Sequence, residues 1–260
     1  MSYALVDELK RGSCSGARFV EASNLVDEIK VIKSAEELAL CQRTAQVQDG
    51  AMRATFDAIR PGMTDSQIAA VAQHYCHSHG AEQGIYLCAS WPPGQVAQFA
   101  NWHMGNRAIQ PGDYFSLLVE TNGPGGFYTE LGRTAVLGRA SQQMKDELHF
   151  VKEARQFTIS RLKPGNSAAE IAVAYNEFMR SRGRPEETRL YCHGQGYDMV
   201  ERPLIREDET MQIQASMNIV VHPTYRKDGG MHWLCDNYII GAEGAGDRLH
   251  RFPEEITEIA

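Results

Sequence analysis

The sequence predicts an α+β fold made of two pseudo-symmetric halves, with helices packed on a curved, mostly antiparallel sheet. Two observations support this prediction. The segment IRPGMTDSQIAAVAQHYCHSHG (59–80) recurs in outline as LKPGNSAAEIAVAYNEFMRSRG (162–183), at a constant offset of 103 residues. Strand-like segments separated by Gly and Pro follow each copy, so helices precede strands in both halves. Two such halves would meet at a central cleft lined by polar residues from both.

The start of the chain stands outside this repeat. We expect residues 1–30 to be a remnant or linker of an N-terminal domain, and residues 31–260 to form the main domain. The stretch GARFVEASNLVDEIKVIKS alternates like a strand that leads into a linker. Ser34 and Glu37 then match the S-x-x-E pattern of a capping box, which predicts a helix from there to about Ile59.

The two copies of the repeat share their start and stop signals. In each copy Pro-Gly ends the preceding helix, and Thr64 or Asn166/Ser167 caps the next one. Gly80 and Gly183 then end the repeated helices. This shared pattern indicates an internal structural duplication.

Three strand-like segments follow each repeated helix. After the first helix come GIYLCAS, DYFSLLVET and GFYTELGRTAVLG. After the second come RLYCHGQG, SMNIVVHPTY and WLCDNYIIGAEG. Because both sets are short and bounded by turn residues, we expect the strands to pair mostly antiparallel.

The composition excludes several classes of function. The chain has 260 residues, 43% of them hydrophobic, and a formal charge of −7, which argues against a nucleic-acid partner because phosphate binding needs a basic face. No apolar run approaches the roughly 20 residues of a membrane span, and the N-terminus lacks the apolar core of a signal peptide. The six cysteines show no CxxC pair. We therefore expect reduced thiols and a cytoplasmic protein.

Four motifs resemble one enzyme family. IQPGDYFSLLVE, GFYTELGRT, HGQG and MNIVVHPTY are similar to motifs of the pita-bread hydrolases of peptidase family M24, such as methionine aminopeptidase, prolidase, Xaa-Pro aminopeptidase and creatinase. The resemblance covers about residues 30–245. It implies the pita-bread fold, with a catalytic-type domain over residues 31–260. It also suggests a homodimer, because relatives of the creatinase type are dimers.

The peptidases of this family hold two metal ions with Asp, Asp, His, Glu and Glu. Of these ligands the resemblance retains only the histidine, His193. It places Glu130 at the second Asp, and His222 and Cys235 at the two Glu positions. The first Asp falls on Leu118 or Val119, with Glu120 close by on the strand and able to face the same side.

This altered ligand set does not favour the standard pair of metal ions, which depends on shared carboxylates. Glu130, His193 and His222 could instead hold a single divalent ion, and Cys235 would strengthen zinc binding. A cofactor is therefore either absent or one divalent metal ion. For His222 and Cys235 the alternative of ordinary core residues remains open.

Creatinase offers a precedent for lost metal ligands, because it works through a histidine proton shuttle. The resemblance places His103 at that position, and a histidine of near-neutral pKa suits proton transfer. Gly132 stands where creatinase has a glutamate that binds its substrate, so creatine itself is not expected. Glu201 aligns with an acidic residue of the second half and is a candidate substrate-binding residue.

These residues predict an enzyme that hydrolyses a C–N bond of a small polar, zwitterionic or dipeptide-like substrate. In this prediction His103, Glu130, His193 and His222 are catalytic, while Glu120, Glu201 and Cys235 bind substrate. One alternative is a hydrolase, peptidase or lyase with one metal ion on the same fold. The other is an inactive module that binds a peptide or protein in the same cleft.

Overall fold

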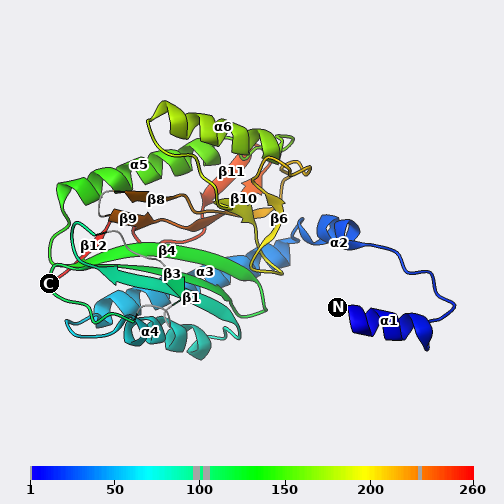
Figure 1. Cartoon of the computed structure of the whole chain (residues 1–260), viewed down its shortest axis with the longest axis horizontal. Helices are drawn as coiled ribbons and strands as arrows, with labels where there is room; N and C mark the ends of the chain where they lie inside the picture. The colour runs from blue at the N-terminus through cyan, green and yellow to red at the C-terminus, as the bar shows by residue number, and fades with distance from the viewer. Residues whose placement is uncertain (1, 96–99, 102–105, 228–229) are drawn as a thin grey trace.

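The computed structural model describes residues 2–95, 100–101, 106–227 and 230–260. Within them the chain forms two halves of similar build, each with a pair of helices packed on a mostly antiparallel sheet (Figure 1). The exception is β12 (Thr257–Ile259), which pairs parallel with β4 (Tyr128–Leu137). The predicted α+β architecture of two similar halves is confirmed. None of the helices in the described ranges combines the length and the apolar character needed to cross a membrane.

The first half opens with two capped helices, α3 (Ala35–Ala58) and α4 (Asp65–Ser78). Ser34 accepts a hydrogen bond from the backbone N–H of Glu37, and the Glu37 carboxylate accepts one from the N–H of Ser34. This reciprocal capping box fixes the start of α3 where the sequence predicts it. Thr64 and Gln67 form the same arrangement at α4.

The second half repeats this build with α5 (Gln142–Ile159) and α6 (Ala168–Ser181). Helices α4 and α6 both contain 14 residues. The turn before each is held in the same way, because Gly62 donates to Ile109 O at 2.7 Å and Gly165 donates to Ile213 O at 2.8 Å. The internal duplication predicted from sequence is thus visible down to single hydrogen bonds.

Each half contributes one five-stranded sheet. The first has the order β12-β4-β3-β1-β2, with strands β1 (Gly84–Trp91), β2 (Ala100–Asn101), β3 (Tyr114–Asn122), β4 (Tyr128–Leu137) and β12 (Thr257–Ile259). The second has the order β11-β10-β7-β5-β6, with strands β5 (Cys192–Gly194), β6 (Glu201–Leu204), β7 (Asn218–Val221), β10 (Asp236–Gly241) and β11 (Gly244–Arg248). A separate hairpin pairs β8 (Thr224–Lys227) with β9 (Gly230–Trp233).

The two sheets meet at an antiparallel bridge between Gly132 of β4 and Cys235, just before β10. One core packs α3 and α4 on the first sheet, and the other packs α5 and α6 on the second. The two faces of β3 serve both cores, since Leu118 belongs to one and Val119 to the other. Side chains on the Leu118 face of β3 therefore point toward the second half.

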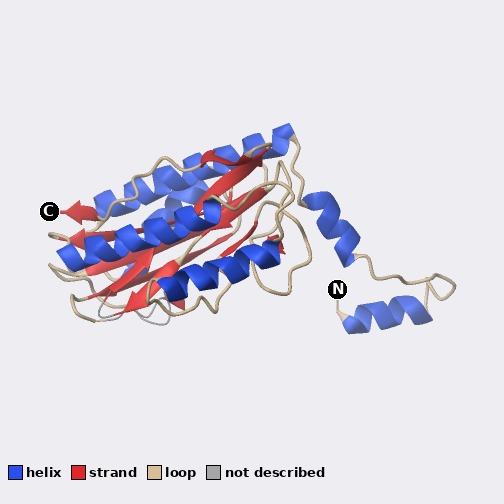
Figure 2. Ribbon diagram, turned by 90° about the horizontal axis from the view of Figure 1, so that it is seen from above, coloured by secondary structure: helices blue, strands red, loops and turns tan. Residues whose placement is uncertain are grey.

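The N-terminal segment differs from the prediction. Residues 2–30 contain two helices, α1 (Tyr3–Arg11) and α2 (Ser23–Lys30), and no strand. Figures 1 and 2 both show α1 lying apart from the rest of the chain, and neither helix contains a buried residue. The alternating pattern was misleading because Leu25, Val26 and Ile29 also fit one face of a helix.

Candidate active site

Two carboxylates face each other where β3 and β4 pair. Glu120 lies directly opposite Glu130 in the antiparallel ladder, while Leu118 lies opposite Gly132. Both glutamates are buried. Leu118 is one of the two positions at which the resemblance places the first aspartate. Glu120 follows it by two residues on β3 and therefore lies on the same face of the strand.

Burial raises the pKa values of both carboxyl groups. Loss of solvation, reinforced by the charge on Glu130, raises the pKa of Glu120 to about 9. Loss of solvation also raises the pKa of Glu130 to about 7. Two buried like charges cannot both ionise cheaply, so the pair holds a proton or a nearby cation at neutral pH.

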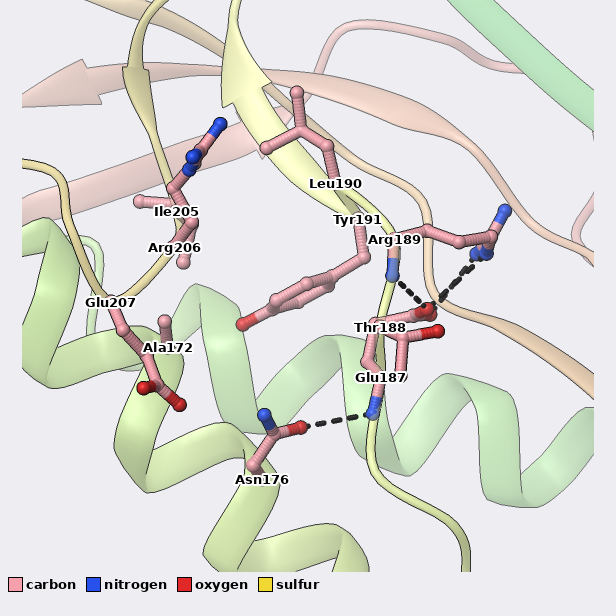
Figure 3. A pocket seen from close by; sticks show the side chains of 10 residues that line it. All are labelled: Ala172, Asn176, Glu187, Thr188, Arg189, Leu190, Tyr191, Ile205, Arg206 and Glu207. Atoms are coloured by element: carbon pink, nitrogen blue, oxygen red, sulfur yellow. Dashed lines mark hydrogen bonds and ion pairs between the residues drawn. The ribbon is translucent and has the colours of Figure 1, made fainter.

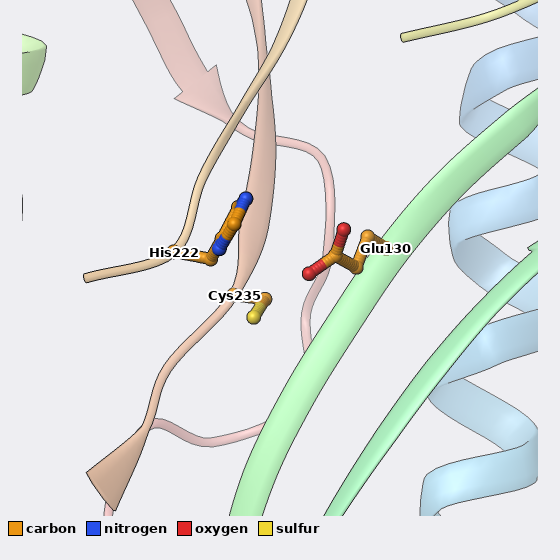
Figure 4. Close-up of side chains that lie close together, drawn as sticks. All are labelled: Glu130, His222 and Cys235. Atoms are coloured by element: carbon orange, nitrogen blue, oxygen red, sulfur yellow. The ribbon is translucent and has the colours of Figure 1, made fainter. Parts of the chain in front are cut away.

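The second half brings His222 and Cys235 to Glu130. One ligand atom from each of these three side chains lies within 4.8 Å of the other two (Figure 4). Figure 4 shows Glu130 reaching from β4 toward the other two side chains, which come from the opposite half. The sequence predicted a set of Glu130, His193 and His222, whereas the structure groups Cys235 with Glu130 and His222.

His222 is buried, yet neither of its ring nitrogens has a hydrogen-bond partner among the described residues. Burial, together with the charges of His193 and Arg189, holds the pKa of His222 well below its usual range. The ring is therefore neutral and has a lone pair to donate. A buried unpaired imidazole costs free energy unless another group binds it, which favours a ligand role over an ordinary core position.

His193 lies edge-on to His222, with ring centroids 5.2 Å apart. Its Nδ1 is 2.8 Å from the backbone O of Gly194, so this nitrogen carries the proton and Nε2 is the acceptor. Burial lowers the pKa of His193 to about 4. The predicted site histidine is thus neutral, with its tautomer fixed by the Gly-rich turn that follows it.

A network of amide side chains holds the two carboxylates. Gln195 donates through Nε2 to Glu120 at 2.8 Å and accepts at Oε1 from Asn237 at 2.9 Å. The Oδ1 of Asn237 in turn accepts from the backbone N–H of Glu130 at 2.8 Å. Asn218 completes the network through its Oδ1, which accepts from Asn237 at 3.1 Å. This satisfied network fixes Glu120 relative to Glu130.

An ion-pair cluster lies next to Cys235. The carboxylate of Asp236 accepts from Arg133 at 2.7 Å and from Arg155 at 2.5 Å, and all three side chains are buried. Arg133 also donates to the backbone O of Cys235 at 3.0 Å. Because Arg133 is on β4, the cluster ties the strand of Glu130 to the strand that follows Cys235.

The predicted substrate-binding residue Glu201 lies outside this group. The carboxylate of Glu201 is occupied by Lys33 at 2.5 Å and by the backbone N–H of Asp198 at 2.9 Å. With both oxygens engaged, Glu201 is unsuited to bind substrate. His103 lies outside the described residues, so its role as a proton shuttle stays a prediction.

A separate pocket of about 380 Å³ lies beside α6 (Figure 3). None of the predicted site residues lines it. Its Arg189 pairs with Glu187 at 3.0 Å, and its Arg206 is paired with Asp208. Because its cations already have acidic partners, we do not assign the active site to this pocket.

Sequence reasoning missed the residues that support the site. Gln195 lies in the HGQG motif, directly after the predicted site residue His193 and Gly194, and this position was the signal that could have identified it. Asn218 and Asn237 occupy strands whose alternation predicts burial, and a buried amide requires partners. That requirement could have indicated a polar network, but not which carboxylate it holds.

Comparisons with known proteins agree with this fold. Residues 39–245 match the model of metallopeptidase family M24, so the chain belongs to that family of hydrolases. An Xaa-Pro dipeptidase of Pyrococcus furiosus is 23% identical over 98% of this chain and 73% of its own length. A methionine aminopeptidase of Staphylococcus epidermidis is 22% identical over 79% of this chain and 88% of its own.

Solved structures show the same architecture. The prolidase of Pyrococcus horikoshii OT3 superposes with a TM-score of 0.84 at 21% identity, covering 98% of this chain and 73% of that one. An X-Pro aminopeptidase of Thermotoga maritima MSB8 gives a TM-score of 0.85 at 18% identity, covering 100% and 73%. The resemblance predicted from the four motifs is confirmed.

Proposed function

We propose that this chain hydrolyses a C–N bond in a small polar or dipeptide-like substrate. The site consists of buried acids, imidazoles and a thiol from both halves, namely Glu120, Glu130, His193, His222 and Cys235. Membership of a hydrolase family supports the reaction class. The relatives named above act on peptides by their names, which supports an amide-type bond.

We further propose that Glu130, His222 and Cys235 hold a single divalent metal ion, with Zn²⁺ the best match. The unpartnered ring of His222, within 4.8 Å of a carboxylate and a thiol, is the observation that supports this proposal. Carboxylate, imidazole and thiolate are all zinc ligands, and three of them suit a catalytic site. When bound by these residues, Zn²⁺ would supply an activated water as nucleophile and a Lewis acid for the carbonyl oxygen.

The chain's own residues then account for proton transfer. Glu120 lies opposite Glu130 and is held by Gln195, so it is placed beside the reacting atoms without belonging to the ligand set. A cation near the pair offsets the like charge and favours the ionised carboxylate. Glu120 takes a proton from the attacking water as the C–O bond forms, and passes it to the nitrogen as the C–N bond breaks.

His193 orients the substrate in this scheme. Its Nε2 is an acceptor because Nδ1 donates to the backbone of Gly194. An acceptor beside the site can bind the N–H of an amide or ammonium group. The neutral state of His193 suits this role over a wide pH range.

Metal analysis tests the proposal. Wild-type protein incubated with Zn²⁺ and then dialysed should retain about one ion per chain. His222→Ala and Cys235→Ser should each abolish this retention, whereas His74→Ala, at an exposed histidine of α4, should not. Retention of Zn²⁺ by both site variants would overturn the metal proposal.

Metal-free hydrolysis with His103 as the proton shuttle is the second candidate. The raised pKa values of Glu120 and Glu130 favour it, because a pair that shares a proton needs no cation. Turnover of a panel of dipeptides, small amides and guanidino compounds in the presence of a chelator would support it. Absence of turnover in every condition would favour a binding module.

A further inference from the structure

A buried ion pair joins Lys33, in the linker before α3, to Glu201, the first residue of β6. The Nζ of Lys33 lies 2.5 Å from Oε2 of Glu201, and both side chains are at most 1% exposed. The two residues are separated by 168 positions in the sequence. Their pairing is therefore a long-range tie and not a product of local structure.

Glu201 organises the loop that precedes it. Its Oε1 accepts from the backbone N–H of Asp198 at 2.9 Å, while its own backbone pairs with Gly194. The side chain thus closes the turn over residues 195–201. Lys33 neutralises the buried charge that this closure requires.

Gln195, at the other end of the turn, connects the turn to Glu120 in the active site. One hydrogen of its Nε2 goes to the backbone O of Met199 at 2.9 Å, and the other goes to Glu120 at 2.8 Å. The amide can bind Glu120 in this orientation only while Met199 stays in place. The position of Met199 depends on the turn that Glu201 closes.

We propose that Lys33 is a positioning residue for the active site, which acts through Glu201 and Gln195 on the carboxylate of Glu120. The role of Glu120 in catalysis rests on the proposed function. The positioning itself rests on the chain of contacts from Lys33 to Glu120. It also gives Glu201 a function other than substrate binding.

Packing distinguishes Lys33 from its neighbour Lys30. A Cβ atom on Gly196 would lie 2.6 Å from Cε of Lys33, so the lysine stem runs directly beneath the turn and needs glycine there. Lys30 also contacts this turn, through Asp198 at 2.6 Å, but this pair is partly exposed. An exposed pair contributes little, so Lys30 is a matched control on the same turn.

The test compares two variants of the holoenzyme. Lys33→Met/Glu201→Gln removes both charges, which avoids leaving one of them buried alone, and Lys30→Met removes the exposed contact. We expect the double variant to lose about tenfold or more in kcat, because displacing a reacting group by about an ångström has effects of that size. KM and Zn²⁺ content should stay within about twofold of wild type, and Lys30→Met should change none of these quantities.

A double-mutant cycle separates positioning from general stability. If Lys33 acts through Gln195, adding the Lys33→Met/Glu201→Gln changes to Gln195→Ala should cause no further loss of kcat. Losses that multiply, or a double variant with the kcat of wild type, would overturn the proposal.

Structures of the variants keep the two proposals distinguishable. If wild-type protein turns over no compound of the panel, the proposed function fails, and crystal structures then decide the positioning. The Gln195–Glu120 hydrogen bond of 2.8 Å should be broken in Lys33→Met/Glu201→Gln and intact in Lys30→Met. An intact bond in both variants would overturn the positioning role.

Discussion

Glu120 and Glu130 lie directly opposite each other across the β3–β4 ladder, and both are buried. Like charges in such cross-strand positions destabilise a sheet, and burial adds to the cost. The arrangement therefore lowers the stability of the folded protein, and a catalytic role for the pair would explain why it is present.

Glu120→Gln should stabilise the metal-free protein while it abolishes activity. Glutamine keeps the hydrogen bond from Gln195 but removes one of the two opposed carboxylates, so we expect a higher Tm in a chelator. A residue that moves a proton typically contributes about 10²–10⁴-fold to the rate, so kcat should fall by that factor. The exposed Glu82→Gln is the control for both measurements. A lower Tm, or unchanged kcat, would contradict the assignment.

Asp236→Asn should destabilise the protein strongly. The change leaves Arg133 and Arg155 without the carboxylate that both contact inside the core. Removing one partner of a buried ion pair costs about 3–5 kcal/mol of unfolding free energy. Denaturant titration should show this loss, and Asp208→Asn, in the exposed pair with Arg206, should show no measurable change. Equal effects of the two variants would mean that the buried cluster has no special role.

Acid stability should depend on Glu209. Its carboxylate accepts from the Arg202 guanidinium and from the backbone N–H groups of Leu204, Thr210 and Met211. These partners outweigh burial and lower the pKa of Glu209 from 4.5 to about 2. Because the folded pKa lies below the unfolded one, this contribution is complete above about pH 5. It is lost as the pH falls toward 2.

The difference amounts to at most about 3 kcal/mol at neutral pH. Glu209→Gln should therefore lower the Tm at pH 7, and the gap from wild type should close between about pH 5 and pH 2. Melting curves across this range give the measurement. A gap that is constant with pH would show that the ionised carboxylate is not the stabilising group.

Sequence alone could predict the fold because its signals are local and occur twice. The caps at Ser34, Thr64 and Ser167 lie where the sequence placed them, and α4 and α6 follow the repeat. The N-terminal segment had no second copy to check the reading, and its short apolar pattern fitted a strand and a helix equally. The fold prediction was reliable because the same capping and turn signals occur in both halves.

The site was only partly predictable, because its members come from distant strands. Spacing along β3 identified Glu120 and the motif resemblance identified Glu130 on β4, but the register that pairs them depends on the length of the β3–β4 turn. Whether His193 or Cys235 joins His222 depends on how the two sheets meet, which no local pattern encodes. Glu201 looked functional by position, and only its contact with Lys33 shows what it binds.

The duplication also makes a quantitative prediction. Thr64 and Ser167 each accept a hydrogen bond from the backbone N–H three residues on, at 3.3 Å in both cases. Thr64→Ala and Ser167→Ala should therefore cost similar amounts, about 1 kcal/mol each. Ser78→Ala, at the exposed end of α4, is the control and should be neutral. A cost at only one cap would show that the two halves have diverged in stability.

Gly132→Ala should damage the junction between the two sheets. A Cβ atom at this position would lie 2.0 Å from Cδ1 of Trp233 and 2.8 Å from Sγ of Cys235. The indole cannot move freely, because it packs on His222 with ring centroids 6.2 Å apart. We expect overpacking to cost about 1–3 kcal/mol and to displace Cys235.

Loss of Zn²⁺ retention in Gly132→Ala, together with a lower Tm, would show that the junction and the metal site share this contact. Gly16→Ala is the matched control, because a Cβ at Gly16 meets nothing within 4 Å, and it should change neither property. If Gly132→Ala kept wild-type Tm and bound Zn²⁺ normally, Trp233 could not be packed as the structure has it.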